Sequence, residues 1–487
     1  MRGSNSALHN PFLFLRGATV ANSRRRFLKA TSAAVAAWGI SKQPFAWADA
    51  PGQVEVWRTA GDRRHEKAGS LSWKAVDRMP DGAILINPTV TRQEMLGFGA
   101  ALTDASCYVL SQMPAGPQQA LMEELFAPGA MELNVCRTAI GSSDYSRTVY
   151  SFDESADPDP ELKKFSIDHD RAYILPILSA ARHINPELFL FSSPWSPPGW
   201  MKSNGSMLGG AMRKPNFEPY AHYLAKFLAE YKTAGVPIDA ITVQNEVDTD
   251  QDGRMSACLW GQEYEIEFVK SHLGPLFRKE GVATKIWILD HNYNLWGRAI
   301  DELSDAGLYE FVDGIAWHGY AGEPSAMTRV HEAFPQKSTY WTEGGPEYTA
   351  PDYQTDWARW VYKFNGIVNN WARSITAWNV ALDEQGKPNV GPFSCGGLVT
   401  VENATHKVTR SGQYWALAHY SRHVQRGARV IAASDSGVSV AAFQNPDGGM
   451  VVVLANCGPE RRAQLVLVPK ALEIDLEANS VCTLNWR

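Results

Sequence analysis

Residues 240–246 read AITVQNE and residues 338–343 read STYWTE, and each run is a short apolar segment that ends in a carboxylate. Similar segments recur between about residues 91 and 410, at 95–102, 132–140, 188–194, 285–291, 312–318 and 374–380. Helix-like stretches separate them, with apolar residues at three- to four-residue spacing, for example at 218–235, 260–281 and 356–372. Eight strands that alternate with helices predict an α/β fold, a (β/α)8 TIM barrel over residues 91–410.

Both flanks of this region have the pattern of β structure. Residues 49–90 contain strand-like segments at 53–58, 70–76 and 83–90, and five more β runs follow a helix-like stretch at 411–424. Pro-Asp-Gly-Gly at 446–449 separates two of these runs and is typical of a hairpin turn. We expect a side β-sandwich over 411–487, completed by the N-terminal strands of 49–90 and packed closely against the barrel.

Composition and charge exclude several classes of protein. The 487 residues are 45% hydrophobic and 20% charged, which is ordinary for a globular chain and excludes a disordered one. No apolar run reaches the roughly 18–20 residues of a membrane-spanning helix, so we expect no stable membrane span. Without residues 1–48, which carry seven Lys and Arg and no Asp or Glu, the formal charge falls from −6 to −13. Such an acidic chain argues against nucleic acid as a partner.

Residues 1–48 have the pattern of an export signal. SRRRFLK at 23–29 precedes the weakly apolar ATSAAVAAWGI at 30–40, and Ala46-Trp47-Ala48 forms a cleavage site of the A-x-A type. The paired arginines followed by Phe-Leu-Lys resemble a twin-arginine signal, which is read by the twin-arginine export machinery. We therefore predict a periplasmic or secreted bacterial protein. The alternative is a basic tail with an accidental A-x-A site, and the true start codon stays open.

The cysteines show no metal-binding pattern. Six remain after residue 48, with no CxxC pair and no zinc-like spacing, at positions 107, 136, 258, 395, 457 and 482. An oxidising destination permits disulfides, but a core of this size does not need them. We expect mostly buried free thiols, with a bridge between Cys457 and Cys482 as the one open pairing.

Two carboxylates stand at the ends of predicted strands four and seven. Glu246 ends AITVQNE and Glu343 ends STYWTE, about three βα units apart. In a barrel both would face one mouth at the carboxyl ends of the strands. A carboxyl pair that flanks a bond is what glycoside hydrolysis requires, one as proton donor and one ionised. A separation of about 5–5.5 Å would indicate retention and about 6.5–9.5 Å inversion. For either Glu alone, an ion pair or a cap is the ordinary role.

Six ordered motifs carry a resemblance to a known family: GFGAALTDAS (97–106), SPWSPPGWMKSNG (193–205), TVQNE (242–246), AWHGY (316–320), WTEGG (341–345) and WNVALDEQGKPN (378–389). Together they resemble glycoside hydrolase family 30, which includes glucosylceramidases and β-1,6-glucanases, and the likeness spans most of 84–487. The resemblance implies a TIM barrel with a side β-sandwich and a retaining mechanism. It also implies that Glu246 is the acid/base and Glu343 the nucleophile.

Several polar residues at strand ends are candidates for sugar binding. Asn245 can reach a sugar 2-hydroxyl, or it is a turn residue. Asp104 can accept two glycone hydroxyls, at O4 and O6, or cap the helix expected at 105–112. His318 and Tyr320 can orient Glu343 or bound hydroxyls, or they form a polar pair of structural value only.

The remaining candidates are aromatic or basic. Trp195 and Trp378 can offer flat faces to a pyranose, or they are core residues. Arg137 can lower the pKa of Glu343 and keep it ionised while Glu246 stays protonated, or it forms a structural salt bridge.

The substrate is less narrowly indicated. The loop PNVGPFSCGGLVTVE at 388–402 resembles the β-1,6-glucanase and β-glucosidase members rather than the glucosylceramidases, which carry a sugar-contacting Asn near the position of Pro392. We therefore expect a retaining β-glycosidase that cleaves β-1,6-glucan or a β-glucoside, with glucosylceramide as the alternative. Linkage, endo or exo action and oligomeric state stay open.

Two other classes compete with this interpretation. A metal-dependent hydrolase could use Asp290, His291 and His318, but such enzymes commonly carry an HxH on the first strand, and 95–104 has none. We therefore expect no metal and no cofactor. The second alternative is a non-catalytic carbohydrate-binding protein, against which the presence of both carboxylates and Asn245 argues.

Overall fold

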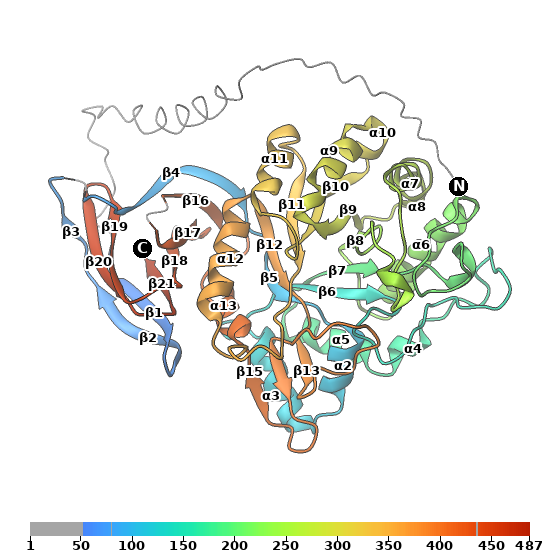
Figure 1. Cartoon of the computed structure of the whole chain (residues 1–487), viewed down its shortest axis with the longest axis horizontal. Coiled ribbons are helices and arrows are strands. Elements are labelled where there is room, and N and C mark those ends of the chain that lie inside the picture. The colour runs from blue at the N-terminus through green and yellow to red at the C-terminus, as the bar shows by residue number, and fades with distance from the viewer. Residues whose placement is uncertain (1–51, 79, 435–436) are drawn as a thin grey trace, which may run out of the picture. The chain divides into compact units, whose positions relative to one another are not determined.

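Eight parallel strands form a barrel in the computed structural model, which describes residues 52–78, 80–434 and 437–487 (Figure 1). In chain order they are β5 (Gly97–Ala100), β6 (Val135–Ile140), β7 (Phe189–Pro194), β8 (Ala240–Thr242), β9 (Lys285–Asn292), β10 (Val312–His318), β11 (Ser338–Glu343) and β12 (Ala372–Ala377). From β6 on, each pairs with the next, and β12 pairs with β5. Between β5 and β6 the Leu102 amide donates to the Arg137 carbonyl at 2.8 Å. The predicted barrel is confirmed.

Two glycines of the GFG sequence let β5 approach β6. A Cβ at Gly99 would lie 1.9 Å from the carbonyl oxygen of Val135, and a Cβ at Gly97 would lie 1.9 Å from Oδ1 of Asn134. No side chain fits at such distances, so the closeness of the first two strands depends on these glycines.

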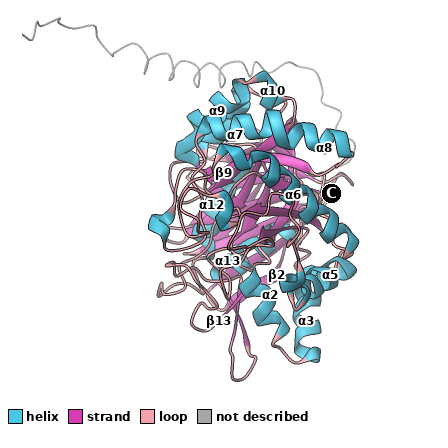
Figure 2. Ribbon diagram, turned by 90° about the vertical axis from the view of Figure 1, so that its right-hand side faces the viewer, coloured by secondary structure: helices cyan, strands magenta, loops and turns pink. Residues whose placement is uncertain are grey.

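Helices surround the barrel strands (Figure 2). They are α2 (Asp104–Ser111), α3 (Ala115–Phe126), α4 (Asp168–Arg171), α5 (Ile174–Ile184), α6 (Phe217–Thr233), α7 (Gln262–Phe268), α8 (Gly274–Glu280), α9 (Trp296–Ser304), α10 (Ala306–Tyr309), α11 (Ser325–Ala333), α12 (Trp357–Asn369) and α13 (Gly412–Ser421). In α12 the buried residues Trp357, Val361, Phe364 and Val368 follow the three- to four-residue spacing of one helix face. That spacing is the signal that predicted these helices.

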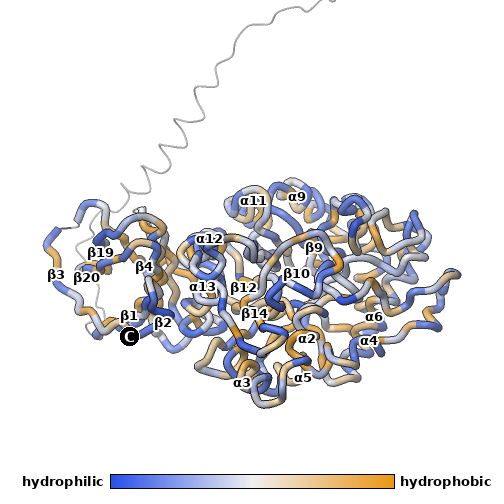
Figure 3. Tube along the Cα trace, turned by 60° about the horizontal axis from the view of Figure 1, so that its bottom comes forward, coloured by the Kyte–Doolittle hydropathy of each residue, from blue (hydrophilic) through white to orange (hydrophobic). Residues whose placement is uncertain are grey.

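The chain ends outside the barrel form the β-sandwich. Its strands pair in the order β2 (Arg63–Leu71), β1 (Val54–Ala60), β21 (Ser480–Trp486), β18 (Met450–Asn456), β17 (Ser439–Gln444), β16 (Arg429–Ala433), β4 (Ile84–Glu94), β19 (Arg461–Leu467), β20 (Lys470–Leu476) and β3 (Lys74–Ala75). Hydrophobic and hydrophilic residues alternate along strands such as β20 (Figure 3). The N-terminal strands complete this unit, as expected, because β1 pairs with β21 and β4 with β16.

Helices α12 and α13 join the barrel to the sandwich (Figure 1). Asn365 Nδ2 donates to Ser439 Oγ at 3.0 Å, and Asn369 Nδ2 donates to the Val440 carbonyl at 2.8 Å. Phe443 and Val453 of the sandwich belong to the same buried apolar cluster as the barrel core. The two parts therefore pack closely, as the sequence predicted.

A third, small sheet follows the last barrel strand. Its strands are β13 (Ala381–Asp383), β14 (Val399–Val401) and β15 (Val408–Arg410). Strand β13 precedes the loop at 388–402 and pairs with β14, which lies near the end of that loop. The small sheet therefore holds the loop at both ends.

All six cysteines are described and all are free thiols. The Cys457–Cys482 bridge is wrong, because Cys482 lies opposite Leu454 in the β18–β21 ladder. A three-residue offset places the two cysteines ~10 Å apart along the strands. That exceeds the ~7 Å Cα separation that a disulfide tolerates.

The helices of the described residues include none that is long and apolar enough to span a bilayer. The leader predicted at 1–48 lies outside the described residues.

Candidate active site

A cavity of about 380 Å³ is lined by residues that follow the carboxyl ends of the barrel strands. The lining residues are Asp144, Trp195, Asn245, Glu246, Thr249, Gln251, Met255, His291, Asn292, Tyr320, Glu343, Trp378, Phe393 and Cys395. The rings of Trp195 and Trp378 stack with centroids 5.3 Å apart and form an aromatic wall. Tyr320 and Phe393 are 46% and 42% exposed, which places them at the rim. Trp195 and Trp378 are each only 2% exposed and belong to a buried apolar cluster, so the predicted alternative of core residues also applies to them.

Glu246 lies four residues beyond the end of β8, which is shorter than the sequence predicted. The strand stops at Thr242, and Glu246 has a left-handed backbone with φ of 53°. This conformation is unfavourable for a residue with a Cβ and is held here by a bond from the Glu246 amide to the Asp290 carbonyl at 3.0 Å. The turn brings the carboxylate into the cavity, where Gln251 Nε2 donates to Glu246 Oε2 at 2.8 Å.

Glu343 is the last residue of β11, as predicted. Its Oε2 accepts a hydrogen bond from Arg137 Nη1, and its Oε1 accepts one from the Tyr320 hydroxyl at 3.0 Å. Both carboxylate oxygens therefore have a donor, and the residue is only 6% exposed. This arrangement fixes the orientation of the carboxylate.

His318, the last residue of β10, lies between the two carboxylates. Its Nδ1 is 3.4 Å from Glu246 Oε1, and its Nε2 is 3.7 Å from Glu343 Oε2 and 3.0 Å from Asp290 Oδ1. The imidazole is fully buried. Because one ring separates them, Glu246 and Glu343 face a common space, as two carboxylates on strands four and seven are expected to do.

Arg137 of β6 connects several residues of the site by hydrogen bonds from the barrel interior. Besides Glu343, it donates through Nη2 to Asn245 Oδ1 at 2.6 Å and to Asp290 Oδ2 at 2.7 Å. Its Cζ lies 4.7 Å from the ring centre of Trp195. Burial lowers the pKa of Arg137, but the charges of Asp290 and Glu343 outweigh that effect and raise it. Arg137 therefore forms buried ion pairs with Asp290 and Glu343, which is one of its two predicted roles.

The neighbours of Glu246 shift its pKa. Burial raises the pKa of Glu246, but His318, His291 and the hydrogen bond from Gln251 outweigh it and hold this pKa below its ordinary value. The lowered pKa favours the charged form of Glu246, whereas the mechanism predicted from the sequence needs Glu246 to carry a proton. Burial lowers the pKa of His318, but Glu343, Asp290 and Glu246 together raise it to about 9. The sequence did not indicate that two imidazoles would face Glu246.

Asp104, a predicted sugar ligand, does not line the cavity. It begins α2 after the cap residue Thr103, so it is not itself the cap. Its Oδ1 accepts from the Arg147 amide at 2.9 Å and its Oδ2 from the Tyr173 hydroxyl at 2.8 Å. Both oxygens that were expected to bind the glycone are thus already bonded within the protein.

Asp144 is the aspartate that lines the cavity, and sequence reasoning missed it. It follows β6 by four residues and is 5% exposed. Burial raises its pKa well above the ordinary value, and the charges of Glu343 and Glu246 raise it further. The raised pKa favours the neutral carboxyl, which can both donate to and accept from sugar hydroxyls.

Asp290 and His291, considered above only as metal ligands, both take part in the site. Asp290 accepts bonds from Arg137, His318 and three hydroxyls, those of Thr242, Ser193 and Thr342. Burial raises the pKa of Asp290, but Arg137 and His318 outweigh this and hold it far below the usual range. His291 lines the cavity beside Glu246. The signal for both was their place at the end of KIWILDH.

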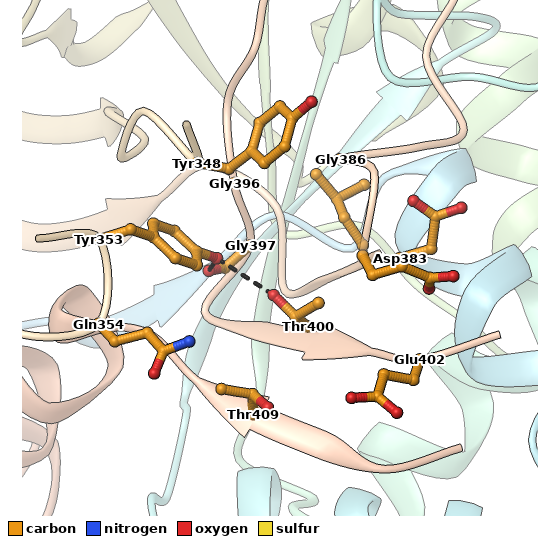
Figure 4. Close-up of a pocket in the computed structure, with 12 residues that line it drawn as sticks. Tyr348, Tyr353, Gln354, Asp383, Gly386, Gly396, Gly397, Thr400, Glu402 and Thr409 are labelled. Carbon is orange, nitrogen blue, oxygen red and sulfur yellow. Dashed lines mark hydrogen bonds between the residues drawn. The ribbon is translucent and has the colours of Figure 1, made fainter. Parts of the chain in front are cut away.

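A second hollow, of about 250 Å³, lies at the small sheet (Figure 4). Tyr348 and Tyr353 line it together with the carboxylates of Asp383, Glu384 and Glu402. The Tyr353 hydroxyl already donates to the Gly397 carbonyl at 2.8 Å. Neither Glu246 nor Glu343 reaches this hollow, so the paired carboxylates assign the candidate active site to the larger cavity.

Comparison with known proteins agrees with this geometry. The model of the glycosyl hydrolase family 30 TIM-barrel domain matches residues 95–424, and that of the family 30 beta sandwich domain matches 427–484. The endo-1,6-beta-D-glucanase of Neurospora crassa is 32% identical over 79% of this chain and 82% of its own length. Putative glucosylceramidase 1 of Caenorhabditis elegans is 30% identical over 79% of this chain and 78% of its own length.

A solved structure gives the same result. The endo-beta1,6-glucanase BT3312 superposes with a TM-score of 0.81 at 27% identity, covering 89% of this chain and 99% of its own. Since the family models match both the barrel and the sandwich, the chain belongs to glycosyl hydrolase family 30.

Proposed function

We propose that this family 30 glycosidase cleaves β-1,6-glucan or a related β-glucoside with retention of configuration, with Glu246 as acid/base and Glu343 as nucleophile. The observation that carries the proposal is the position of the two carboxylates, on either side of His318 in one cavity with an aromatic wall. A sugar bound in this cavity would lie beside both carboxylates.

In the first step, a carboxylate oxygen of Glu343 attacks the anomeric carbon as the bond to the leaving oxygen breaks. Glu246, which must take up a proton before this step, gives that proton to the leaving oxygen, and a glycosyl ester of Glu343 forms. The bonds from Arg137 and Tyr320 hold the attacking carboxylate in place, so little reorganisation is needed.

In the second step, water attacks the anomeric carbon of the ester while Glu246 takes one of its protons. The bond to Glu343 breaks, the sugar leaves as a hemiacetal and the carboxylate is regenerated. Asn245, which also lines the cavity, is held by Arg137 through Oδ1, so its amide N–H groups remain for the sugar 2-hydroxyl.

Two observations favour a β-1,6-glucan over a glycolipid. The Neurospora enzyme and BT3312 are both named as β-1,6-glucanases. The rim residues Tyr320 and Phe393 are single exposed aromatics rather than part of a broad apolar surface. Glucosylceramide is the second candidate, because the Caenorhabditis relatives are named as putative glucosylceramidases.

The test is a substrate panel with product stereochemistry. The purified chain is given pustulan-type β-1,6-glucan, laminarin, xylan, glucosylceramide and an aryl β-glucoside, and the first-formed anomer is followed by proton NMR. We expect the largest kcat/KM on the β-1,6-glucan and a β-anomer as first product. Preference for glucosylceramide would select the second candidate, a first-formed α-anomer would contradict retention, and binding without turnover would indicate a carbohydrate-binding protein.

We also propose export through the twin-arginine machinery to the periplasm or the medium, on the motif at 23–29 and the A-x-A site at 46–48. Replacing Arg24 and Arg25 by Lys should leave the precursor in the cytoplasm. Normal export of that variant would contradict the proposal.

A further inference from the structure

Three ligand-type side chains converge at one point on the cavity wall. One ligand atom each of Glu246, His291 and His318 lies within 4.8 Å of the other two. The two imidazoles are inclined at 74°, with ring centroids 5.8 Å apart, so they do not stack on one another. From their contacts we propose that these residues form a binding site for a divalent transition metal ion, with zinc as the best fit, and that the bound ion inhibits the enzyme.

The first support is that both imidazoles turn one nitrogen toward the same carboxylate oxygen. His318 Nδ1 is 3.4 Å and His291 Nδ1 is 3.7 Å from Glu246 Oε1. Both nitrogens are buried, and neither makes a hydrogen bond to any described residue. Apart from these contacts with Glu246, the two buried nitrogens have no partner among the described residues, so a metal ion could bind between them and the carboxylate oxygen.

The second support is the carboxylate behind each ring. His318 Nε2 lies 3.0 Å from Asp290 Oδ1, and His291 Nε2 lies 2.6 Å from Asp248 Oδ1. Metal-binding histidines usually donate their second nitrogen to a carboxylate in this way, which orients the ring and strengthens the ligand. Here both histidines have that arrangement.

The third support is the spacing of the ligand atoms. Tetrahedral ligands at ~2.0–2.1 Å from zinc are ~3.3 Å from one another. The distances of 3.4 and 3.7 Å from Glu246 Oε1 are close to this value, so small side-chain movements would suffice. Two imidazoles and one carboxylate suit zinc, copper or nickel and do not suit magnesium or calcium, which prefer oxygen ligands. The fourth position would open to the cavity.

A metal ion here would compete with the proposed chemistry. Glu246 Oε2 already accepts from Gln251, and the ion would occupy Oε1. The carboxylate would then hold no transferable proton, so the leaving group could not be protonated. This inhibition rests on the proposed role of Glu246, whereas the binding of the ion does not.

Direct binding tests the site without any assay of activity. The chelator-treated chain is titrated with cobalt(II) chloride and followed by visible absorption, and zinc affinity is measured by calorimetry. We expect one strong tetrahedral-type cobalt band per chain, displaced by zinc and absent with magnesium. His291→Gln should abolish the band. Asp248→Asn, which alters an exposed residue outside the three ligands, should weaken zinc binding ~10–100-fold.

The matched control is His183→Gln, which removes an exposed imidazole on α5 and should leave the band unchanged. A band that persists in His291→Gln, or is lost in His183→Gln, would overturn the site. Zinc should also inhibit turnover of an aryl β-glucoside, with recovery on adding a chelator, and Asp248→Asn should require more zinc relative to its own metal-free rate. Binding without inhibition would overturn the inhibitory role alone, and a chain without glycosidase activity would still give the cobalt result.

Discussion

Arg137 donates a buried hydrogen bond to Glu343, and the arginine side chain has no exposure to solvent. The bond reaches the carboxylate from the barrel interior. Glu343 is therefore held on its interior side, while its other side faces the cavity. A nucleophile needs this combination of fixed orientation and open access.

Glu343→Gln should abolish turnover. The amide keeps the size and one hydrogen-bond acceptor, so Arg137 retains a partner, but the amide cannot form the glycosyl ester. We expect kcat to fall ~10⁴-fold or more, with sugar binding by calorimetry and the thermal midpoint close to those of the unaltered chain. Residual activity above a hundredth of normal would exclude Glu343 as nucleophile.

Glu246→Ala should affect substrates according to their leaving groups. Activated aryl glycosides need little protonation, so their first step should survive, whereas an unactivated β-glucoside should lose most of its rate. Azide can enter the space left by the side chain and attack the glycosyl ester without a general base. Steady-state rates with and without azide test this, and the absence of rescue would count against Glu246 as acid/base.

The sequence predicted the barrel and both carboxylates because the signals were local. Each strand is an apolar run. The last residue of such a run lies at the barrel mouth, whichever direction its side chain takes. This is why Glu343 and His318 were found. Glu246 was also found, although its strand ends four residues earlier, because the turn that follows still leads into the mouth.

Side-chain direction could not be predicted in the same way. Asp104 and Asp144 both follow barrel strands, but only the packing around them decides which one faces the cavity. Tyr173, which lies in the turn before α5 and almost seventy residues later, donates a hydrogen bond to the Asp104 carboxylate. The lowered pKa of Glu246 has the same origin, because His291 and His318 come from two other strands.

Tyr320→Phe should lower kcat with little change in KM. The hydroxyl donates to Glu343 Oε1 at 3.0 Å, and a hydrogen bond to a charged group contributes about 1.5–3 kcal/mol. We therefore expect kcat/KM to fall ~10–100-fold. Tyr362→Phe is the control, because Tyr362 is 62% exposed on α12 and should have no effect. Equal rates for the two variants would show that this bond does not position the nucleophile.

Asp144→Ala and Asp104→Ala should have opposite signatures. Asp144 lines the cavity, so its loss should raise KM and reduce kcat/KM while the thermal midpoint changes little. Asp104 accepts two buried bonds, so its loss should lower the free energy of unfolding by about 1–3 kcal/mol, with KM unchanged. Steady-state kinetics and urea unfolding of both variants separate these roles, and a raised KM for the Asp104 variant alone would reverse the assignment.

The free energy of unfolding should decrease in acid because three histidines are buried where α13 meets β2. Burial lowers the pKa of His65 to about 2, helped by His423 and Arg422, and burial together with Arg422 lowers the pKa of His423 to about 3. Burial, together with its neighbours, also holds the pKa of His419 well below normal. In the unfolded chain each titrates near pH 6.5. Their contribution is therefore complete above about pH 6.5 and decreases as the pH falls, because only the unfolded chain takes up protons.

His423→Gln isolates one of these three. Its Nε2 lies 2.9 Å from His65 Nε2, and the glutamine cannot be charged. Between pH 7 and pH 5, one histidine with a folded pKa near 3 costs about 2 kcal/mol of unfolding free energy. The variant should lose that much less than the unaltered chain over the same range. Urea unfolding at both pH values measures the difference, with His183→Gln as the control because it removes an exposed imidazole. An identical acid loss in His423→Gln and the unaltered chain would mean that His423 is charged in the folded protein.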